Sequence, residues 1–325
     1  MEAFVTGGAG FLGYHLVKRL VAEGWQVRVL DRITSRQQEF RDLGVTFLPG
    51  SITDRRSLFK LLETDTAALF HVAGNTSLWG RNDRQQTLDN VEGTQNLLDA
   101  ARARGVGRFI HTSSFTVYGF QQGCFNEQTT STAQHSKINY FSSKAQAELR
   151  VKTAAAQGLD AVILNPANIM GPQDYRNWSQ LFVLIDREKL PGAPPGAGSF
   201  AYAEAVAAAH LAAFHKGRSG ENYLLGGVDL TYLQLIREIG GHLGRKVPQR
   251  ATPGWLLAGL AGMQDAVSRL TRKEPDVTPE KARFFSGTLC CDDAKARQEL
   301  GYRSVGLERM IQVTAAWLRT EGLIR

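Results

Sequence analysis

The amino-acid sequence predicts an α/β protein, a doubly wound parallel sheet followed by a smaller, mainly helical lobe. Three features indicate this. A glycine-rich turn follows the first apolar strand, strand and helix patterns then alternate as far as Asn165-Pro166, and a loop-rich stretch beyond that point leads into a largely helical tail. Alternating strands and helices build parallel sheets with helices on both faces, because each crossover between parallel strands needs a covering helix.

The glycine-rich turn has the form of a phosphate-binding loop. Its sequence is Val5-Thr6-Gly7-Gly8-Ala9-Gly10-Phe11-Leu12-Gly13, between the apolar strand 3–5 and a helix with an apolar face. The glycines at 8, 10 and 13 fit the dinucleotide spacing G-x-G-x-x-G, and those at 7, 10 and 13 fit the looser G-x-x-G-x-x-G. Glycines let the backbone approach a pyrophosphate, and the helix N-terminus presents free N–H groups to it.

An acidic residue ends the second predicted strand. That strand is Gln26-Val27-Arg28-Val29-Leu30, and Asp31 follows it. A carboxylate about 20 residues beyond the last glycine is where a dinucleotide's adenosine ribose hydroxyls are held. The alternative is that Asp31 is a helix N-cap or an ordinary loop carboxylate. Turn and carboxylate together predict a Rossmann nucleotide site.

Composition limits the class of protein. The chain has 325 residues, enough for one large α/β domain and a smaller one, and its formal charge is +7. The basic residues are scattered without interleaved aromatics, which favours solvated helix faces over nucleic-acid binding, although a mild attraction for anionic ligands remains. No apolar run is long enough to span a bilayer and the first strand starts near residue 2, so we expect no membrane span and no signal peptide.

The cysteines indicate a reducing compartment. Cys124, Cys290 and Cys291 show no metal-ligand spacing, and two of them are adjacent. We therefore expect no disulfide framework, no metal site and a cytoplasmic location.

The expected elements define two parts. Strands are expected at residues 3–5, 26–30, 45–48, 67–72, 108–112, 161–164 and 221–225, and helices at 54–63, 83–104, 138–156, 204–216, 232–243, 254–270, 292–300 and 307–320. We assign residues 1–167 to the Rossmann domain, with 202–225 returning to it, and residues 168–201 and 226–325 to a substrate-binding lobe. The apolar run Trp255–Leu260 is expected to pack its helix on the lobe core, with a dimer face or a membrane-surface helix as alternatives.

Tyr140 and Lys144 are the predicted acid–base pair. Four residues apart on a helix, their side chains share one face. A phenol with a pKa of about 10 is a poor catalyst at neutral pH, and a neighbouring ammonium lowers that pKa. The fifth strand ends in His111-Thr112-Ser113-Ser114, which places hydroxyl groups at a strand's carboxyl end. Such a set can exchange a proton with an alcohol oxygen while a hydride moves at the adjacent carbon.

Several segments together resemble the extended short-chain dehydrogenase/reductase family, whose members are NAD-dependent epimerases, dehydratases and reductases. The matching segments cover almost the whole chain and are Thr6–Gly13, His71-Val-Ala-Gly74, Asn90-Val-Glu-Gly-Thr94, Thr112–Gly119, Tyr140–Lys144, Asn165-Pro166 and Gly171-Pro172. Trp79 and the segment Leu300-Gly301-Tyr302 resemble dihydroflavonol reductase-like and hopanoid-associated epimerase-like members.

The resemblance implies roles for individual residues. Tyr140 is the general acid/base, Lys144 lowers its pKa and binds the nicotinamide ribose, and Ser114 is the catalytic serine. The implied cofactor-binding residues are Gly7, Gly10, Phe11, Leu12, Gly13, Asp31, Arg32, Ser51, Ile52, Val72, Ala73, Gly74, Asn90, Thr112, Ser113, Tyr140, Lys144, Pro166 and Ile169. Of these, Ser51 and Ile52 would flank the adenine, and Asn90 would be structural, tying a helix to the loop after the fourth strand.

Two departures from the family pattern bear on the substrate. The family usually has Asp where Ser51 stands, which puts the contact to the adenine amino group in doubt. Many sugar-nucleotide members carry an arginine and then a His-Val-Asp-Asp-like run where this chain reads Ser199-Phe-Ala-Tyr-Ala-Glu204. An arginine that grips a diphosphate is therefore not evident.

The leading function is an NAD(P)-dependent oxidoreductase acting on a carbonyl or secondary alcohol of a small, partly apolar molecule. The alternatives are a nucleotide-sugar epimerase or dehydratase with tightly bound NAD, and a non-catalytic nucleotide-sensing protein. Asp31 favours NAD, whereas Arg32 and Arg36 would favour NADP. Five aromatic residues are candidates for the substrate pocket, namely Trp79, Phe115, Phe120, Trp178 and Phe182. We also expect a homodimer formed through helices 83–104 and 138–156.

Overall fold

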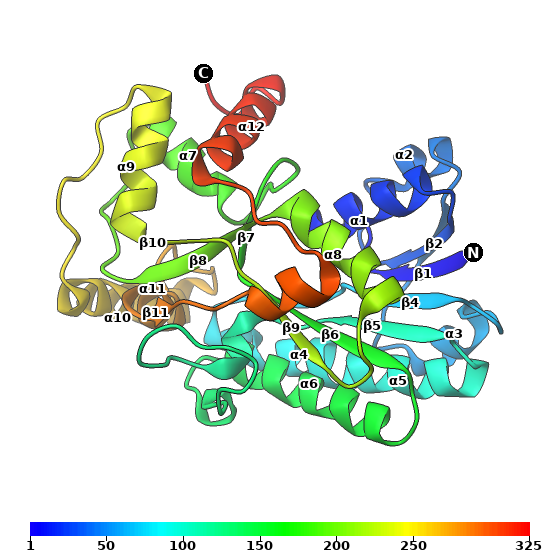
Figure 1. Ribbon diagram of the computed structural model, residues 1–325. Helices are drawn as coiled ribbons and strands as arrows, with labels where there is room; N and C mark the ends of the chain where they lie inside the picture. The colour runs from blue at the N-terminus through cyan, green and yellow to red at the C-terminus, as the bar shows by residue number, and fades with distance from the viewer.

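The computed structural model describes residues 1–325 and places two sheets side by side, each with its own helices (Figure 1). The larger sheet consists of β1 (Glu2–Thr6), β2 (Gln26–Asp31), β3 (Thr46–Pro49), β4 (Ala68–His71), β5 (Arg108–Thr112), β6 (Ala161–Pro166) and β9 (Asn222–Leu225). All of its paired strands are parallel, in the order β3-β2-β1-β4-β5-β6-β9. The predicted doubly wound sheet is therefore confirmed, and its order reverses between β1 and β4, where ligands bind in such folds.

Helices cover both faces of this sheet (Figure 1). On one face lie α1 (Phe11–Ala22), α2 (Gln37–Asp42) and α8 (Ala203–Lys216), and on the other lie α3 (Arg55–Leu61), α4 (Asp83–Thr87), α5 (Gly93–Arg104) and α6 (Asn139–Ala156). Neighbouring strand residues point to opposite faces, so Phe4 and Val5, both fully buried, belong to different cores. The strands β4 and β6 are buried on both faces, which explains why each has a nearly continuous apolar sequence.

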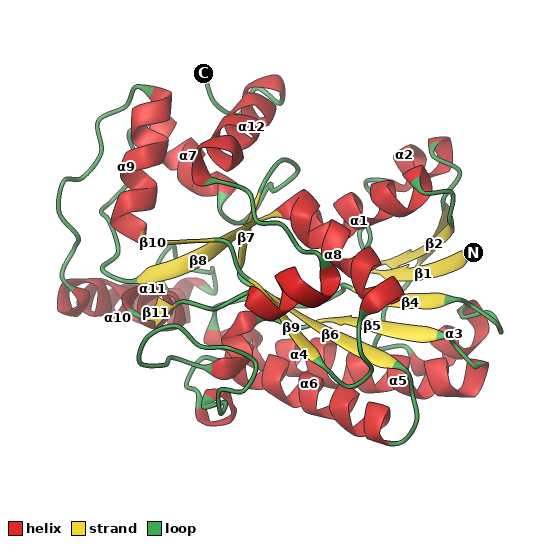
Figure 2. Cartoon of the chain, viewed as in Figure 1, coloured by secondary structure: helices red, strands yellow, loops and turns green.

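The smaller sheet was not predicted from the sequence. It consists of β7 (Asn168–Met170), β8 (Ala197–Tyr202), β10 (Val228–Thr231) and β11 (Thr288–Leu289), with every other strand pairing to β8. Around it lie α7 (Ser179–Asp186), α9 (Tyr232–Leu243), α10 (Gly254–Thr271), α11 (Pro279–Ser286) and α12 (Leu307–Thr320) (Figure 2). These strands are two to six residues long and their partners are distant in sequence, which leaves little local periodicity.

The chain passes between the two sheets more than once. After β8 it returns to the larger sheet through α8, which packs on α1, and through β9, which pairs with β6. It then re-enters the smaller sheet at β10. No helix is both long enough and apolar enough to cross a bilayer.

Two predicted helices are interrupted. The helix expected at 83–104 contains a π-helical turn at Leu88–Glu92, and the helix expected at 292–300 is π-helical over Ala296–Leu300. In the first case the turn carries Asn90 to the loop after β4, and Gly93 passes so close to Ile52 that a Cβ would lie 2.6 Å from its side chain. The interruption thus coincides with contacts to distant segments. Apolar periodicity in the sequence does not reveal such contacts, so it predicted an uninterrupted helix.

The expectation that the cysteines stay unpaired is wrong in this structure. Cys124, in the loop after Tyr118, is joined by a disulfide to Cys290, which follows β11. The backbone of the next residue, Phe125, also donates to the Cys290 carbonyl at 3.0 Å. The partners are 166 residues apart in sequence, and Cys124 lies in the loops after β5 whereas Cys290 follows β11 of the smaller sheet, so their approach depends on tertiary structure alone. Cys291 is free and buried.

Candidate active site

A cavity of about 410 Å³ lies at the carboxyl ends of the parallel strands, between the larger sheet and the smaller one. Its walls come from the glycine turn, the ends of β2, β4 and β5, the start of α6, the β6–β7 connection, and Trp178 and Phe284 of the smaller lobe. The cavity is therefore assembled from segments spread along most of the chain.

The glycine turn forms one end of the cavity. Gly7 has φ of +73°, and a Cβ there would lie 2.5 Å from the backbone nitrogen of Ala73. A Cβ on Gly13 would lie 2.1 Å from the Gly7 carbonyl oxygen. The looser spacing of glycines at 7, 10 and 13 thus marks the closest backbone contacts. Helix α1 begins after Gly10 without a side-chain cap, which leaves its first N–H groups available to an anion.

Asp31 connects β2 to this turn. One carboxylate oxygen accepts from the backbone N–H of Ala9 and the other from that of Ile33, both at 2.9 Å. Burial raises the pKa of Asp31, and these hydrogen bonds oppose the rise. Each oxygen keeps a lone pair for a further donor, such as a ribose hydroxyl.

The two nearby arginines have different surroundings. Arg32 lines the cavity and forms a two-pronged contact with Asp89, both N–O distances being 3.3 Å. Arg36 lies over the Tyr14 ring, 3.9 Å from its centroid, and donates to Gln173 at 2.7 Å. Arg36 is not among the residues that line the cavity.

Most of the residues predicted to bind the cofactor border the cavity. These are Gly7, Gly10, Phe11, Leu12, Gly13, Asp31, Arg32, Ser51, Ile52, Val72, Ala73, Gly74, Thr112, Ser113, Tyr140, Lys144, Pro166 and Ile169. Asn90 is the exception. Its side chain is buried, accepts from the N–H of Asn75 at 2.7 Å and donates to the carbonyl of the same residue at 3.0 Å. Asn90 therefore fixes the loop after β4, as the structural role predicted for it requires, and does not reach the cavity.

The three predicted catalytic residues all line this cavity. Ser114, just past the end of β5, accepts from the Thr116 hydroxyl at 2.9 Å and from its N–H at 3.3 Å. Because both bonds are accepted, the Ser114 hydroxyl proton is free to be donated elsewhere. Burial raises the pKa of Tyr140 above its usual value of 10.0, and a hydrogen bond with Ser114 opposes the rise. Thr116, which sequence reasoning did not single out, thus orients the serine.

The Lys144 side chain contacts the end of β5. Its ammonium is buried and donates to the backbone carbonyl of Thr112 at 2.6 Å. Burial lowers its pKa from 10.5 to about 8, and the Glu148 carboxylate opposes that change. That Lys144 lowers the pKa of Tyr140 stays a prediction; burial raises that pKa, and the hydrogen bond with Ser114 opposes the rise. Burial disfavours the charged phenolate, so the buried phenol keeps its proton.

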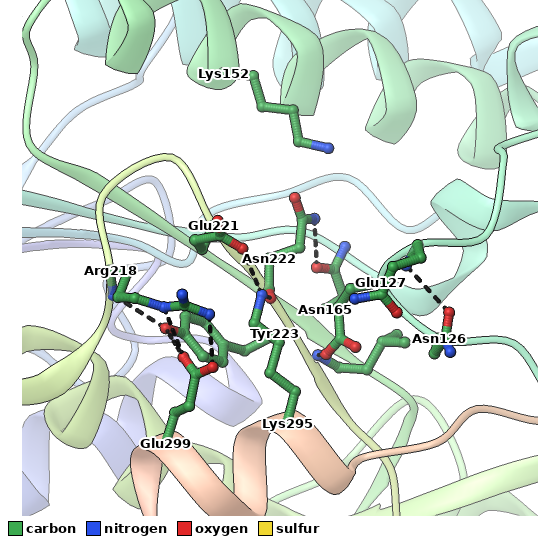
Figure 3. Close-up of polar contacts among 12 residues, drawn as sticks. Asn126, Glu127, Lys152, Asn165, Arg218, Glu221, Asn222, Tyr223, Lys295 and Glu299 are labelled. Carbon is green, nitrogen blue, oxygen red and sulfur yellow. Dashed lines mark hydrogen bonds and ion pairs between the residues drawn. The ribbon is translucent and has the colours of Figure 1, made fainter.

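Glu148 is a functional candidate that sequence reasoning missed. It follows Lys144 by one helical turn, and its buried carboxylate accepts from Ser113 at 2.7 Å, Asn165 at 2.7 Å and Asn222 at 2.8 Å. Figure 3 shows the two asparagines side by side, with Lys152 directed toward them. Lys152 forms an ion pair with Glu148 at 3.0 Å. The spacing Lys144-x-x-x-Glu148 was a signal that could have identified it.

The predicted aromatic lining is right in part. Phe115 and Trp178 border the cavity, and so does Phe284, which was not named. Trp79, Phe120 and Phe182 do not. Phe182 is fully buried in the core of the smaller lobe, and Phe120 packs on Phe141. Spacing alone did not separate core aromatics from cavity aromatics.

Comparison with known proteins identifies the family. The NAD dependent epimerase/dehydratase family matches residues 3–226. Sterol demethylase protein B of Methylococcus capsulatus is 34% identical over 330 residues, covering 100% of both chains. A putative dihydroflavonol 4-reductase of Synechocystis is 29% identical, covering 99% of this chain and 96% of that one. The sterol-4-alpha-carboxylate 3-dehydrogenase, decarboxylating, of Saccharomyces cerevisiae is 28% identical, covering 99% of each.

Solved structures agree on the fold. UDP-glucose 4-epimerase of Thermotoga maritima superposes with a TM-score of 0.80 at 24% identity, covering 99% of each chain. The dTDP-glucose 4,6-dehydratase of Streptomyces venezuelae, solved with NAD, gives 0.77 at 24% identity, covering 100% of this chain and 99% of that one. With the glycine turn, the strand-end serine and the Tyr140–Lys144 helix at one cavity, the chain belongs to the NAD-dependent epimerase/dehydratase family of extended short-chain dehydrogenases/reductases, a family of enzymes.

Proposed function

We propose that this enzyme transfers a hydride between NAD and a carbonyl or secondary alcohol of a small, partly apolar substrate, with Tyr140 as general acid/base. One observation supports this above the others. Lys144 and Arg32 are the only cationic residues that line the cavity, and Arg32 is paired with Asp89. The wall beyond Tyr140 includes Phe115, Trp178 and Phe284. Such an aromatic wall fits an apolar ring better than the diphosphate of a sugar nucleotide, for which this wall offers no cationic partner.

The fit of the cofactor rests on the turn and on Asp31. Because Gly7 has no Cβ, the turn can pack directly against Ala73. The start of α1 has no side-chain cap, so its N–H groups are available as donors to a pyrophosphate. Asp31 would accept from the adenosine ribose hydroxyls, and its charge would repel a 2′-phosphate. Arg36, the residue that would favour NADP, is held on Tyr14 and Gln173. These contacts support NAD over NADP. When bound, the nicotinamide would accept or donate the hydride.

The protein side of the chemistry is proton transfer and orientation. A Tyr140 phenol with a raised pKa is protonated at neutral pH, so it would act as the acid when a carbonyl is reduced. Ser114, whose oxygen is occupied by Thr116, would donate its proton to the same substrate oxygen. Lys144 would hold the ribose through its ammonium. Two donors at one oxygen stabilise the charge that develops there.

The substrate class is suggested by the relatives. Two of the chains that match this one over nearly their full lengths are named for sterols, a sterol demethylase protein and a sterol carboxylate dehydrogenase. We therefore place alcohols on apolar, polycyclic skeletons first among candidate substrates, before simple ketones and flavonoids.

The test is to compare wild type, Tyr140→Phe and the control Tyr175→Phe against sterols, ketones, flavonoids and sugar nucleotides. Tyr175 is exposed and bonds Glu321, away from the cavity. With an apolar alcohol or ketone, cofactor absorbance should change at the same rate in wild type and in the control. In Tyr140→Phe that rate should fall at least a hundredfold while cofactor binding is retained. Conversion of a sugar nucleotide with tightly bound NAD and no net absorbance change would instead establish the epimerase or dehydratase alternative. Near-wild-type turnover by Tyr140→Phe would remove Tyr140 from the mechanism.

A further inference from the structure

Helix α10 turns an apolar face to the solvent. Trp255, Met263 and Leu270 are 76%, 62% and 87% exposed. Leu256 and Val267 are also exposed, whereas Ala261 and Ser268 are the only buried residues of the helix. With 3.6 residues per turn, the exposed apolar positions fall on one side along the full helix. The apolar run at its start was expected to pack on the lobe core, and Trp255 and Leu256 instead face outward.

This face differs from the other exposed apolar residues of the chain. Elsewhere, residues such as Leu184 on α7 and Tyr175 in the loop before it are exposed singly. Scattered exposed hydrophobic residues are normal in soluble proteins, whereas a contiguous apolar patch marks an interaction surface. The face on α10, where five large apolar residues are exposed on one helix, is therefore a candidate interaction surface.

Cationic side chains surround the C-terminal end of this face. Arg269, Arg272 and Lys273 are exposed there, and Arg81 donates to the Arg269 carbonyl from the loop after β4. Only Arg269 has an ion-pair partner, Asp265 on the same helix. The nearby Glu274 is engaged with Lys281 at 2.9 Å. The formal charge of the whole chain, +7, has the same sign.

The apolar face of α10 and the basic residues at its end together indicate what kind of partner would bind there. A helix with Trp, Leu and Met on one side and basic residues at its border has the composition of helices that lie in the lipid headgroup region. A second copy of the face would cover the apolar residues, but its nearby carboxylates are few, and Asp265 and Glu274 are already paired with Arg269 and Lys281. An anionic lipid surface satisfies both, because its negative potential attracts basic residues while the headgroup region takes up apolar side chains.

We propose that α10 binds the surface of an anionic lipid bilayer, with its apolar face in the headgroup region and the enzyme lying on the membrane. Since α10 is packed on α11, whose Phe284 lines the catalytic cavity, this binding would set the cavity beside the bilayer. The binding itself requires no catalytic activity, so it can be tested independently of the proposed reaction.

The experiment is flotation of the purified enzyme with vesicles of phosphatidylcholine alone or with one-quarter phosphatidylglycerol. Wild type should float with the anionic vesicles, and the exposed Trp255 should shift its emission to the blue. The double variant Met263→Glu/Leu270→Glu should bind at least tenfold more weakly. Leu184→Glu, which adds one charge at a 37% exposed position of α7, should bind as wild type does.

Two further measurements decide the outcome. Arg272→Gln/Lys273→Gln should weaken binding to anionic vesicles and leave binding to neutral ones unchanged. Circular dichroism should be unaltered in each variant, and Met263→Gln/Leu270→Gln replaces Met263→Glu/Leu270→Glu if that variant fails this check.

Absence of wild-type flotation, or equal flotation of the double variant, would overturn the proposal. A wild-type dimer that the double variant dissociates, without vesicle binding, would assign the face to a second copy.

Discussion

The Ser113 hydroxyl donates to the buried Glu148 carboxylate at 2.7 Å, beneath the floor of the cavity. The same carboxylate oxygen accepts from Asn165, which also donates to the Ser114 carbonyl at 3.1 Å. Glu148 thereby holds the backbone that carries the predicted catalytic serine. It also holds the residue after Thr112, whose carbonyl receives Lys144. One carboxylate thus positions both sides of the candidate site.

Glu148→Gln is expected to reduce kcat by about tenfold to a hundredfold. The substitution removes a charge that favours protonated Lys144, and it faces an amide against the amides of Asn165 and Asn222. An orphaned buried polar group costs about 1–3 kcal/mol. The basic limb of the kcat/KM–pH profile should therefore move to lower pH, which a loss of packing alone would not cause.

The matched control is Lys152→Met. Lys152 pairs with Glu148, but its side chain is 45% exposed and makes no hydrogen bond with Ser113 or Ser114. Its removal should leave kcat within about threefold of wild type, since exposed pairs contribute little. Equal losses in both variants, or an unshifted basic limb in Glu148→Gln, would contradict a positioning role for Glu148.

The pH dependence should follow Lys144. Its pKa of about 8 lies below the usual 10.5 because burial disfavours the ammonium. Activity that needs the cation should be full below pH 8 and decline as the pH rises through that value. Stability should change in the opposite direction between about pH 8 and 10.5, because the unfolded lysine binds more protons there than the folded one. Thermal unfolding of Lys144→Met should lack this rise, and a rise of equal size in that variant would assign the effect to another group.

The sequence predicted the larger sheet better than the smaller one for a physical reason. The central parallel strands are buried on both faces, so segments such as 161–164 stand out as apolar runs between helices. In the smaller sheet, β11 has two residues and β7 three, and both pair with β8 across long separations. Helices α9 and α12 were predicted with the bounds that they have, because each has a strongly one-sided apolar pattern.

The residues of the candidate site also differ in whether local sequence or contacts between distant segments identify them. The glycine turn, Asp31, Ser114, Tyr140 and Lys144 are recognisable because their spacing within short segments reflects local geometry. Glu148, Thr116 and Phe284 depend on contacts between segments. The disulfide of Cys124 was missed for this reason too, since no spacing indicates a pairing across 166 residues. The pKa of Lys144 likewise depends on burial, which one sequence does not report.

Cys124→Ser should lower thermal stability under oxidising conditions by several degrees. The disulfide to Cys290 closes a long loop between the two sheets, and such bonds contribute about 2–4 kcal/mol. With dithiothreitol present, wild type and variant should unfold at the same temperature, because the dithiol reduces the bond in wild type. A wild-type protein indifferent to dithiothreitol, with two free thiols by titration besides Cys291, would show that the bond does not form.

Leu149→Glu should dissociate the predicted homodimer. Leu149 on α6 is 54% exposed, and Leu88, in the interrupted helix beside it, is 40% exposed. Both lie on the helices expected to pair across a two-fold axis, where an added like charge would meet its own copy. Sedimentation velocity at micromolar concentration should give a dimer for wild type and for the control Leu184→Glu, and a monomer for Leu149→Glu. A monomeric wild type would refute the predicted assembly.

Asp31→Ala should narrow or reverse a preference for NAD. In wild type the carboxylate would accept from the ribose hydroxyls, and a 2′-phosphate beside it would meet a like charge in a partly buried groove. That repulsion is on the order of 1–3 kcal/mol, roughly tenfold to a hundredfold in affinity. The substitution also removes the acceptor for the Ala9 and Ile33 N–H groups, so it should weaken both cofactors. The ratio of the two dissociation constants is therefore the quantity to measure, because damage to the turn cancels in it.

Arg32→Ala serves as the companion variant, since it removes the only arginine that lines the cavity and should weaken NADP binding selectively. Tighter binding of NADP than of NAD to the unmodified enzyme would show that Arg32 outweighs Asp31 and that the carboxylate does not face the ribose.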